Sequence, residues 1–337
     1  MTTAGAPSGD DCRSTDVLGA ARVLAGGGLV AFPTETVYGL GARADDDRAV
    51  EAIFAAKGRP TDHPLIVHVA GPDQARTFAA SMPGAAQRLV AAFWPGPLTI
   101  IVPRATGVAS GAAAGHPGIG LRCPSHPVAR ALLGEALALG VPGVAAPSAN
   151  RFGRISPTTA QHVREEFGPE LCVLDGGPCA VGIESAIVDC TGEQAVLLRP
   201  GTLERSTIEA VAGDLRAPGG RVSHAAPGTL EAHYAPRARL RMMPAAALSA
   251  ALADLPAPAS ALAVYSRSVP ASRGRPSARL AAWRIMPDDA TAAARQLFAA
   301  LRELDRSGVA EIWVEAPPGT PEWDGVRDRL QRAAAAR

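Results

Sequence analysis

Residues 28–69 read GLVAFPTETVYGLGARADDDRAVEAIFAAKGRPTDHPLIVHV, and this stretch decides the fold of the first half of the chain. The short apolar run 29–32 ends at a proline and predicts a buried strand, and the apolar run 65–69 predicts another. Between them, three aspartates followed by the spaced apolar side chains of 48–56 predict a helix that ends near Gly58. A strand, a helix and a strand in succession are typical of an α/β domain.

The first predicted strand leads into a polar segment that contains Thr34, Glu35 and Thr36. Burying two hydroxyls and a carboxylate at the exit of a strand is costly unless a ligand or a hydrogen-bond network satisfies them. Thr34 and Glu35 fit a local role equally well, with the threonine capping a turn and the glutamate accepting from the backbone. Both interpretations of these two residues therefore stay open at this point.

Two residue types occur once each in this chain. Lysine and arginine together number 33, yet Lys57 is the only lysine, and Asn150 is the only asparagine. A chain so biased toward arginine indicates that Lys57 occupies a place where a compact ammonium group is needed and a planar guanidinium does not serve. Asn150 likewise indicates a need for a neutral donor and acceptor together.

Composition and charge limit the classes of function. The chain has 337 residues, enough for two domains, with 47% hydrophobic and 19% charged residues and a net charge of +1. This balance gives no electrostatic reason for tight nucleic-acid binding. No apolar run has the ~20 residues of a spanning helix, and residues 1–14 resemble no secretory signal, so we expect a disordered lead and a cytoplasmic protein. The five cysteines, without a CxxC pair, indicate reduced thiols rather than a disulfide framework or a zinc site.

Periodicity along the rest of the chain predicts two units. In the first unit, further strands are expected at 98–102, 119–122, 143–146, 171–174, 186–189 and 196–198, and helices at 16–25, 72–93 in two pieces, 125–139, 158–167 and 204–212. The segment 214–236 is rich in Pro, Gly and Ala and predicts a linker. Beyond it, strands at 239–243, 261–265, 282–285 and 310–315 alternate with helices at 245–254, 289–306 and 322–335, which favours a small parallel sheet of the doubly wound kind.

Several motifs occur in a fixed order: AFPTETVYGLGA, AAKGRP, HPLIVHV, FWPGPLTIIV, GLRCPSHP, AAPSANRFGRISPT, GIESAIVD, LLRPG and APGTLEAHYAP. They cover residues 15–236 and resemble the YrdC-like family, more closely its two-domain threonylcarbamoyl-AMP synthases. The resemblance implies an α/β fold in which residues 15–213 form a twisted mixed sheet with helices. It further implies that 214–236 form a linker or lid and that 237–337 form a smaller Rossmann-like parallel α/β domain.

The resemblance also implies a reaction. A nucleotidyltransferase of this family joins L-threonine, bicarbonate and ATP into threonylcarbamoyl-AMP and pyrophosphate. The product serves the tRNA machinery that forms N6-threonylcarbamoyladenosine at position 37. Such an enzyme needs no covalent intermediate, because it holds two anions together and stabilises the leaving pyrophosphate. Mg²⁺ would accompany ATP on its phosphates, and no metal held by protein side chains is implied.

Site residues are implied on two sides. For threonine they are Thr36, His68, Arg122, the backbone at Ala146, and Ser185. For ATP they are Lys57, Arg59, His63, Ser148, Asn150, Ser156, Arg199 and Tyr234, with Lys57 and Arg59 as the catalytic pair. Position 63 is commonly Asn in the family and is His here, which adds a titratable group. Position 118 is commonly a hydroxyl residue and is Gly here, so Gly118 is left out of the predicted set.

Two other classes of function are considered. An RNA-binding module of the same fold is the alternative, but the positive residues lie within Ser-, Thr- and Asn-containing motifs, and aromatic residues are only 4% of the chain. A carbamoyl-transfer module of hydrogenase maturation would bring zinc-knuckle cysteines and an upstream domain, which this sequence does not contain. Tyr234, in the linker, favours a lid whose hydroxyl reaches a phosphate, although the same ring could merely pack against the second domain.

Overall fold

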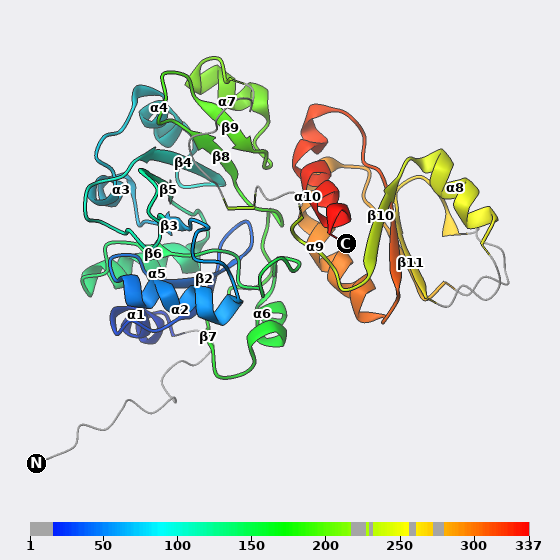
Figure 1. Ribbon diagram of the computed structural model, residues 1–337, viewed down its shortest axis with the longest axis horizontal. Coiled ribbons are helices and arrows are strands. Elements are labelled where there is room, and N and C mark those ends of the chain that lie inside the picture. The colour runs from blue at the N-terminus through cyan, green and yellow to red at the C-terminus, as the bar shows by residue number, and fades with distance from the viewer. Residues whose placement is uncertain (1–15, 217–226, 229–231, 256–260, 272–279, 337) are drawn as a thin grey trace, which may run out of the picture.

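The computed structural model describes residues 16–216, 227–228, 232–255, 261–271 and 280–336. The predicted lead 1–14 and most of the predicted linker lie outside these residues. Two sheets, each covered by helices, lie side by side, and the first half of the chain builds the larger one (Figure 1). This arrangement confirms the predicted fold class, a mixed α/β domain with a smaller parallel α/β domain.

Nine strands of the described residues form the larger sheet, in the order β7-β1-β2-β6-β3-β5-β4-β8-β9. The sheet is mixed: three pairs are parallel (β3 with β5, β4 with β8, β1 with β7) and the other neighbouring pairs are antiparallel. The strands are β1 (Val30–Pro33), β2 (Tyr38–Arg43), β3 (Ile66–His68), β4 (Leu98–Pro103), β5 (Gly118–Arg122), β6 (Val144–Ala145), β7 (Cys172–Val173), β8 (Ala186–Asp189) and β9 (Val196–Arg199).

The helices of this domain lie close to where the sequence predicts them. They are α1 (Val17–Ala25), α2 (Asp47–Lys57), α3 (Pro72–Phe78), α4 (Gly84–Phe93), α5 (Pro127–Ala138), α6 (Ala160–Phe167) and α7 (Arg205–Ala212). Helix α2 begins after Asp46, whose side chain accepts from the backbone of Arg48, and it ends at Gly58 in the left-handed region. The two predicted catalytic residues therefore flank a fixed turn, with Lys57 at the last position of α2 and Arg59 directly after Gly58.

Strand β2 is absent from the sequence-based prediction, which treats Gly39-Leu40-Gly41 as a loop. Gly41 lies inside the strand at a position where no larger residue fits. A Cβ on Gly41 would lie 2.6 Å from Cγ1 of Val144 and 2.8 Å from the ring of Phe32. Glycine usually weakens a strand, so close packing between neighbouring strands outweighs propensity at this position.

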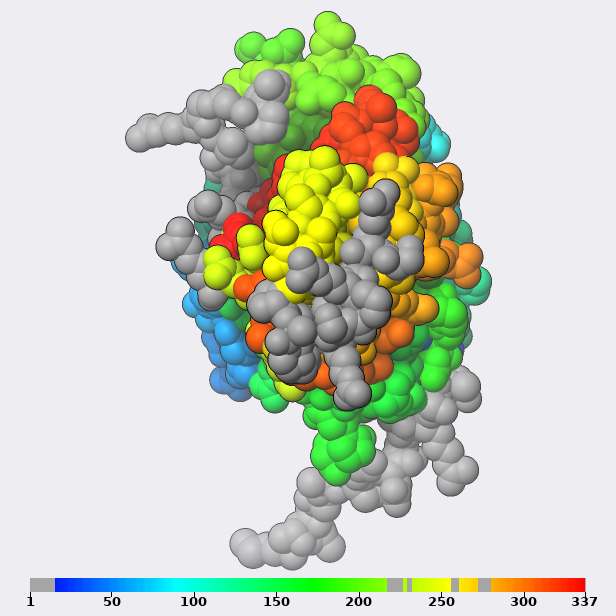
Figure 2. Space-filling model, turned by 90° about the vertical axis from the view of Figure 1, so that its right-hand side faces the viewer, coloured from blue at the N-terminus to red at the C-terminus, as the bar shows by residue number. Residues whose placement is uncertain are grey.

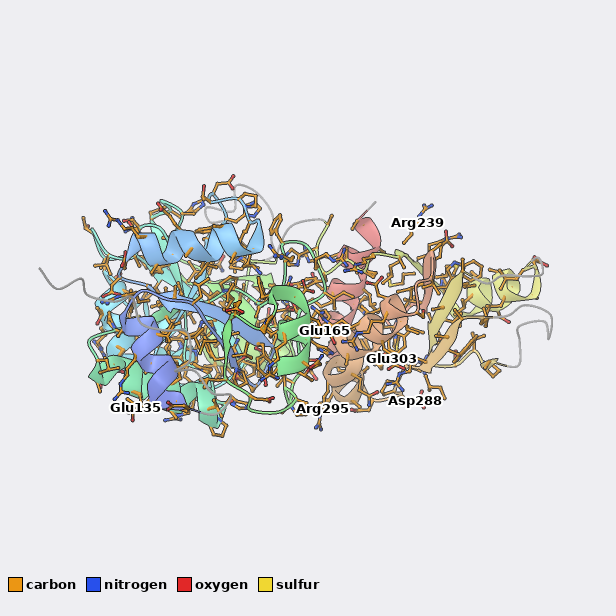
Figure 3. All side chains as sticks on the ribbon, turned by 90° about the horizontal axis from the view of Figure 1, so that it is seen from below. Glu135, Glu165, Arg239, Asp288, Arg295 and Glu303 are labelled. Atoms are coloured by element: carbon orange, nitrogen blue, oxygen red, sulfur yellow. The ribbon has the colours of Figure 1, made fainter. Side chains whose placement is uncertain are left out.

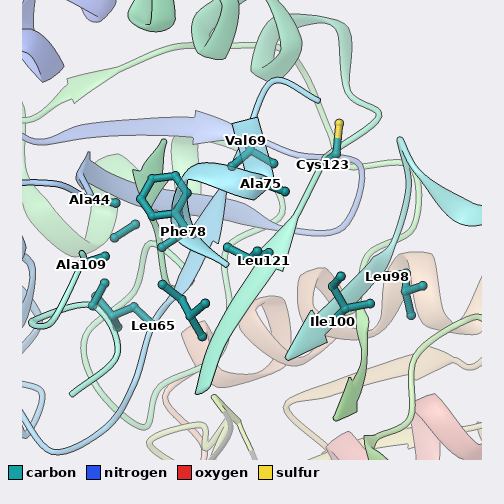
Figure 4. Close-up of a cluster of buried hydrophobic side chains, with 14 of the residues drawn as sticks. Ala44, Leu65, Val69, Ala75, Phe78, Leu98, Ile100, Ala109, Leu121 and Cys123 are labelled. Carbon is teal, nitrogen blue, oxygen red and sulfur yellow. The ribbon is translucent and has the colours of Figure 1, made fainter. Parts of the chain in front are cut away.

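The core of the first domain fills the space between the large sheet and its helices. Figure 4 shows side chains of this cluster, among them Leu65, Phe78, Leu98, Ile100 and Leu121, all at most 1% exposed. Burying a side chain of this size stabilises the fold by about 1.5–3 kcal/mol. Strands β3 and β5, which end at the predicted site residues His68 and Arg122, are thus anchored on their apolar face.

In the described part of residues 239–336, four parallel strands form the smaller sheet, in the order β10-β13-β11-β12. Its elements are β10 (Arg239–Met243), α8 (Ala245–Ala253), β11 (Leu262–Ser266), β12 (Ala282–Ile285), α9 (Ala290–Arg306), β13 (Glu311–Glu315), the short 3₁₀ helix η2 (Pro321–Trp323) and α10 (Asp324–Ala335). Trp313 packs with α8 on one face, whereas its neighbours Ile312 and Val314 pack with α9 and α10 on the other. The predicted doubly wound arrangement is therefore confirmed.

Helices α9 and α10 face the first domain, and α8 lies at the far end of the molecule (Figures 1 and 2). Figure 3 shows Glu165 of α6 at the boundary between the domains, where it forms an ion pair with Arg306 of α9. In the part of the chain that the structure describes, no helix is long and apolar enough to cross a membrane.

The cysteines depart in part from the sequence-based prediction. Cys123, Cys179 and Cys190 are buried free thiols, as predicted. Cys172, in β7, is disulfide-bonded, so the prediction of thiols throughout is wrong at this position. Spacing along the chain does not show which sulfur atoms meet in space, and a bridge between distant residues leaves no CxxC pattern.

Candidate functional site

A cavity lies where strands β1, β3, β5 and β9 of the large sheet end, and the described part of the linker closes one side of it. Eight of the predicted site residues line it: Arg59, His68, Arg122, Ala146, Ser148, Ser185, Arg199 and Tyr234. The other five do not contribute to its wall: Thr36, Lys57, His63, Asn150 and Ser156. Thr34, whose role the sequence leaves open, lines the cavity, and its hydroxyl shares a 2.8 Å hydrogen bond with that of Thr36.

One wall of the cavity carries a buried ion pair. Arg122 ends β5, and its Nη2 donates to Oε1 of Glu35 at 2.6 Å, with both side chains less than one-tenth exposed. The second oxygen of Glu35 accepts from the backbone N–H of Ser125. Burial opposes ionisation of Glu35, but the attraction of Arg122 outweighs it, and the pKa of Glu35 is lowered. Among the described residues the Nη1 of Arg122 has no hydrogen-bond partner, so one side of its fork is free for an anion.

His68 lies beside this pair. It faces Arg122 across the parallel register of β3 and β5, and its ring contacts Phe32 edge to face at 5.9 Å. Burial and the nearby guanidinium lower the pKa of His68 to about 3, so the imidazole is neutral at neutral pH. Its Nδ1 is buried without a hydrogen-bond partner in the described residues. A neutral ring with an unsatisfied nitrogen suits a polar ligand group in the cavity.

A hydroxyl pair connects the two sides of the cavity. The Oγ of Ser185 shares a 2.8 Å hydrogen bond with Thr99 and accepts from Nη2 of Arg199 at 3.2 Å. Arg199, at the end of β9, also donates through Nε to the carbonyl of Ser185 and through Nη1 to the carbonyl of Pro227 at 2.7 Å. Arg199 is therefore held by the sheet on one side and by the linker on the other.

Lys57 lies behind the wall and supports it. It is 3% exposed, and its Nζ donates to the carbonyls of Ser148 at 2.5 Å and of Asn150. Burial, and then the charge of Arg59, lower the pKa of Lys57 well below its ordinary value. An ammonium group has three N–H donors, and two of them hold the loop that follows β6, which lines the cavity through Ser148. This geometry fits the interpretation that a compact cation is needed here.

Arg59 projects into the cavity from beyond the end of α2. Its Nη2 donates to the carbonyl of Pro64, its guanidinium lies 5.7 Å from the centre of the Phe152 ring, and its Nε is buried without a partner in the described residues. Burial lowers the pKa of Arg59 to about 10, which still leaves it charged at neutral pH. His63 lies beside the same ring, 5.5 Å between centres, and is partly exposed, so it lies at the rim of the site.

Asn150 and Ser156 hold the segment between them in place. The amide nitrogen of Asn150 donates to the carbonyls of Arg151 and Arg154, while its Oδ1 is buried without a partner in the described residues. The hydroxyl of Ser156 donates to Oε1 of Glu184 at 2.5 Å. In this conformation both residues therefore shape the loop, and the free Oδ1 of Asn150 is the acceptor that remains for a ligand.

Tyr234, in the linker, contacts both domains. Its ring packs on Phe298 at 5.5 Å and on His233 at 4.2 Å, and its hydroxyl reaches the cavity without a hydrogen-bond partner in the described residues. A Cβ on Gly228 would lie 2.2 Å from this hydroxyl, so the linker passes directly over it. Burial, and then the charge of Glu184, raise the pKa of Tyr234 to about 12, so the hydroxyl is a donor at neutral pH. Both sequence-based interpretations of Tyr234 thus describe part of its surroundings.

Comparisons with known proteins agree with this geometry. A Sua5–YciO–YrdC family model, described as "Telomere recombination", matches residues 22–201, and the model of the threonylcarbamoyl-AMP synthase C-terminal domain matches residues 203–335. The threonylcarbamoyl-AMP synthase of Pyrococcus abyssi is 39% identical over 330 residues, 94% of each chain. The chain belongs to the threonylcarbamoyl-AMP synthase family. The family was therefore predicted correctly from the sequence motifs.

A further relative and a solved structure support the assignment. The threonylcarbamoyl-AMP synthase of Bacillus subtilis is 43% identical over 227 residues, which are 66% of this chain and 64% of that one. A crystal structure of P. abyssi Sua5 complexed with L-threonine superposes with a TM-score of 0.83 at 36% identity and covers 94% of each chain. The fold similarity therefore extends over both domains.

Several residues of the site were not singled out from the sequence. Glu184 and the linker residues Pro227 and Gly228 line the cavity, and Glu184 was visible only as part of the GIESAIVD motif. His233 also lines the cavity, and burial lowers its pKa to about 3. No group of three or more His, Cys, Asp and Glu residues arranged to hold a metal ion occurs within the described ranges.

Proposed function

We propose that this chain is a threonylcarbamoyl-AMP synthase that converts L-threonine, bicarbonate and ATP into threonylcarbamoyl-AMP and pyrophosphate. The observation that supports the proposal most strongly is the composition of one cavity. It combines Arg122, oriented by Glu35, with a second set of cations that includes Arg59 and Arg199. The relative from P. abyssi, which is named for this activity, covers 94% of the chain.

On the threonine side, Arg122 binds the amino-acid carboxylate. Its Nη2 is engaged by Glu35, and the free side of the fork points to an anion that the cavity admits. The neutral ring of His68, the backbone at Ala146 and the hydroxyl of Ser185 bind the remaining polar groups. Thr36 acts through Thr34, because its hydroxyl is bonded to that residue.

On the nucleotide side, cations surround the phosphates. Arg59, Arg199 and the third N–H of Lys57 neutralise charge that moves onto the leaving pyrophosphate when the carbamate oxygen attacks the α-phosphorus. Ser148 and Asn150 position Lys57 through their carbonyls, and Ser156 and Tyr234 add hydroxyls. His63 contacts the nucleotide at the rim. Positioning and charge stabilisation carry the reaction, and no nucleophile on the protein is needed.

Mg²⁺ would enter with ATP and neutralise charge on its phosphate oxygens. The two carboxylates nearest the cavity fit this arrangement, because neither offers a free oxygen. Glu35 is bonded to Arg122 and to the backbone of Ser125, and Glu184 is bonded to Arg329 and Ser156. Phosphate oxygens and water would therefore be the ligands of the ion, in place of protein side chains.

We further propose that the linker is a lid over the first domain. Pro227 and Gly228 lie over the cavity, and Tyr234 closes one side of it while resting on the second domain. Excluding water would protect the carbamate and the mixed anhydride from hydrolysis. The domain limits 15–213, 214–236 and 237–337 belong to the same proposal, as do the transfer of the product to the tRNA machinery and a cytoplasmic location.

Omitting substrates one at a time tests the proposed reaction. Pyrophosphate release from ATP should require both L-threonine and bicarbonate, and each omission should lower the rate at least ~10-fold, because the nucleophile is the carbamate formed from both. L-alanine, which has the carboxylate but no hydroxyl, is the matched control substrate. Undiminished pyrophosphate release without threonine would overturn the proposal.

A further inference from the structure

One arginine of the second domain is fully buried where the two domains meet. Arg329 is on α10, is 0% exposed, and is the largest fully buried side chain among the described residues. Its Nε donates to Oε2 of Glu184 at 2.8 Å, and its Nη2 donates to the carbonyl of the same residue at 3.0 Å. Its Nη1 donates to the carbonyl of Pro200 at 2.7 Å, next to Arg199.

The carboxylate that Arg329 holds faces the cavity. Glu184 lines the cavity wall and precedes Ser185, and its other oxygen accepts from the hydroxyl of Ser156. Burial opposes ionisation of Glu184, but the charges of Arg329 and Arg199 outweigh it and lower its pKa. A carboxylate beside a triphosphate repels it unless the negative charge is balanced. Arg329, which also pairs with Asp328 of its own helix, supplies this balance together with Arg199.

The position of Arg329 is fixed by close packing between the domains. A Cβ on Gly325, one turn earlier on α10, would lie 2.5 Å from the carbonyl of Gly201. A Cβ on Gly182, two residues before Glu184, would lie 2.4 Å from the Cα of Arg295 on α9. The backbones of the two domains therefore meet on both sides of the Arg329–Glu184 pair, and neither side chain can swing away.

Arg329 also contacts Tyr234 of the linker. Its guanidinium carbon lies 5.6 Å from the centre of the Tyr234 ring. A second arginine of this domain, Arg302 on α9, donates to the carbonyl of Ser156 at 3.3 Å and to Glu166 at 2.9 Å. Arg329 touches three structures on the nucleotide side: the Glu184–Ser156 pair, the end of β9, and Tyr234.

We propose that Arg329 is a positioning residue for the nucleotide half of the site, which neutralises Glu184 and holds it, and through it Ser156, in the orientation that ATP requires. This inference rests on the proposed function. It assigns the second domain a defined task in the reaction: its helix α10 completes the electrostatics of a site that the first domain carries.

Calorimetric binding of a non-hydrolysable ATP analogue and of L-threonine to full-length variants tests the proposal. Arg329→Met should weaken binding of the ATP analogue at least ~10-fold and change the threonine Kd less than ~3-fold, because the first-domain residues that Arg329 bonds are Glu184 and Pro200, and it has no contact with Arg122. Arg327→Met is the matched control on the same helix, since Arg327 bonds to Pro318 and Asp324 of its own domain. It should leave both constants unchanged.

A charge rescue separates positioning from a purely structural role. Adding Glu184→Gln to Arg329→Met removes the unbalanced charge and should recover at least ~3-fold of the lost nucleotide affinity. Equal weakening of both ligands, or a double variant no better than Arg329→Met, would overturn the proposal. If Arg329→Met does not fold, Arg329→Lys, which keeps the charge, should bind the ATP analogue better than Arg329→Gln does, and equal binding would overturn it. A wild-type protein that binds neither ligand would instead refute the proposed function.

Discussion

Removing the carboxylate of Glu35 is the most informative single change on the threonine side. In Glu35→Ala, Arg122 stays buried at 4% side-chain exposure but loses its partner at 2.6 Å, and the N–H of Ser125 loses its acceptor. Breaking a buried ion pair by removing one partner costs about 3 kcal/mol at the lower end of the usual range. We use the lower end because this pair lies beside a cavity. The lost hydrogen bond adds about 1 kcal/mol, so we expect the free energy of unfolding to fall by about 4 kcal/mol.

The same change should affect one substrate selectively. Without Glu35 the guanidinium of Arg122 is no longer oriented, so we expect KM for L-threonine to rise at least ~10-fold, about 1.4 kcal/mol. KM for ATP should change less than ~3-fold, because Arg59, Arg199 and Lys57 have no contact with Glu35. Urea denaturation measures the stability, and initial rates of pyrophosphate release measure the two constants.

A surface ion pair provides the control. Asp45 pairs with Arg43 at 2.8 Å with both side chains about a quarter exposed, and Asp45→Ala should cost less than about 1 kcal/mol and leave both KM values unchanged. If Glu35→Ala destabilises the protein no more than Asp45→Ala does and leaves KM for threonine unchanged, the ion pair does not orient Arg122 and the reasoning is refuted.

Three further changes test other parts of the site. Lys57→Arg should lower kcat/KM at least ~10-fold, because a guanidinium cannot bond two carbonyls in the space that a buried ammonium fills; full activity would contradict this. His68→Gln should reduce the loss of stability on acidification. The pKa of His68 is about 3 in the folded protein and about 6.5 in the unfolded chain, so between these pH values only the unfolded chain binds the proton. The wild type therefore loses about 1.4 kcal/mol of unfolding free energy per pH unit as the pH falls through that window. Urea unfolding at several pH values measures this, and an unchanged slope would count against it. Tyr234→Phe should weaken binding of an ATP analogue by about 5-fold without lowering the melting temperature, because its hydroxyl is unbonded in the described residues while the ring contacts remain; equal binding would show that the hydroxyl does not reach the nucleotide.

Periodicity was sufficient to predict most helices and strands of the chain. The acidic start and glycine end of α2, and the alternation of β10 to β13 with helices, follow from local rules that a single sequence expresses. Strand β2 was missed, because its glycines reflect how closely β6 and Phe32 approach, and that approach is set by tertiary packing.

Site residues could be predicted from the sequence only where they lie in recognisable motifs. Lys57 and Asn150 stood out by composition, and the structure shows each holding a loop with its polar atoms. The partners of the key charges were not predictable, because Glu35 and Arg122 are 87 residues apart and Glu184 and Arg329 are 145 apart. Long-range ion pairs depend on where the folded chain brings side chains together, which neither spacing nor propensity encodes.

Mass spectrometry of the reaction mixture tests the central claim most directly. The full-length protein is incubated with ATP, ¹³C-labelled bicarbonate and L-threonine, and the mixture is quenched early, because the mixed anhydride hydrolyses in water. We expect a threonylcarbamoyl-AMP ion that carries one labelled carbon and forms in step with pyrophosphate, and that is lost in Arg122→Ala. Pyrophosphate release without a labelled adduct at any quench time, or an adduct that forms equally well in Arg122→Ala, would contradict the account.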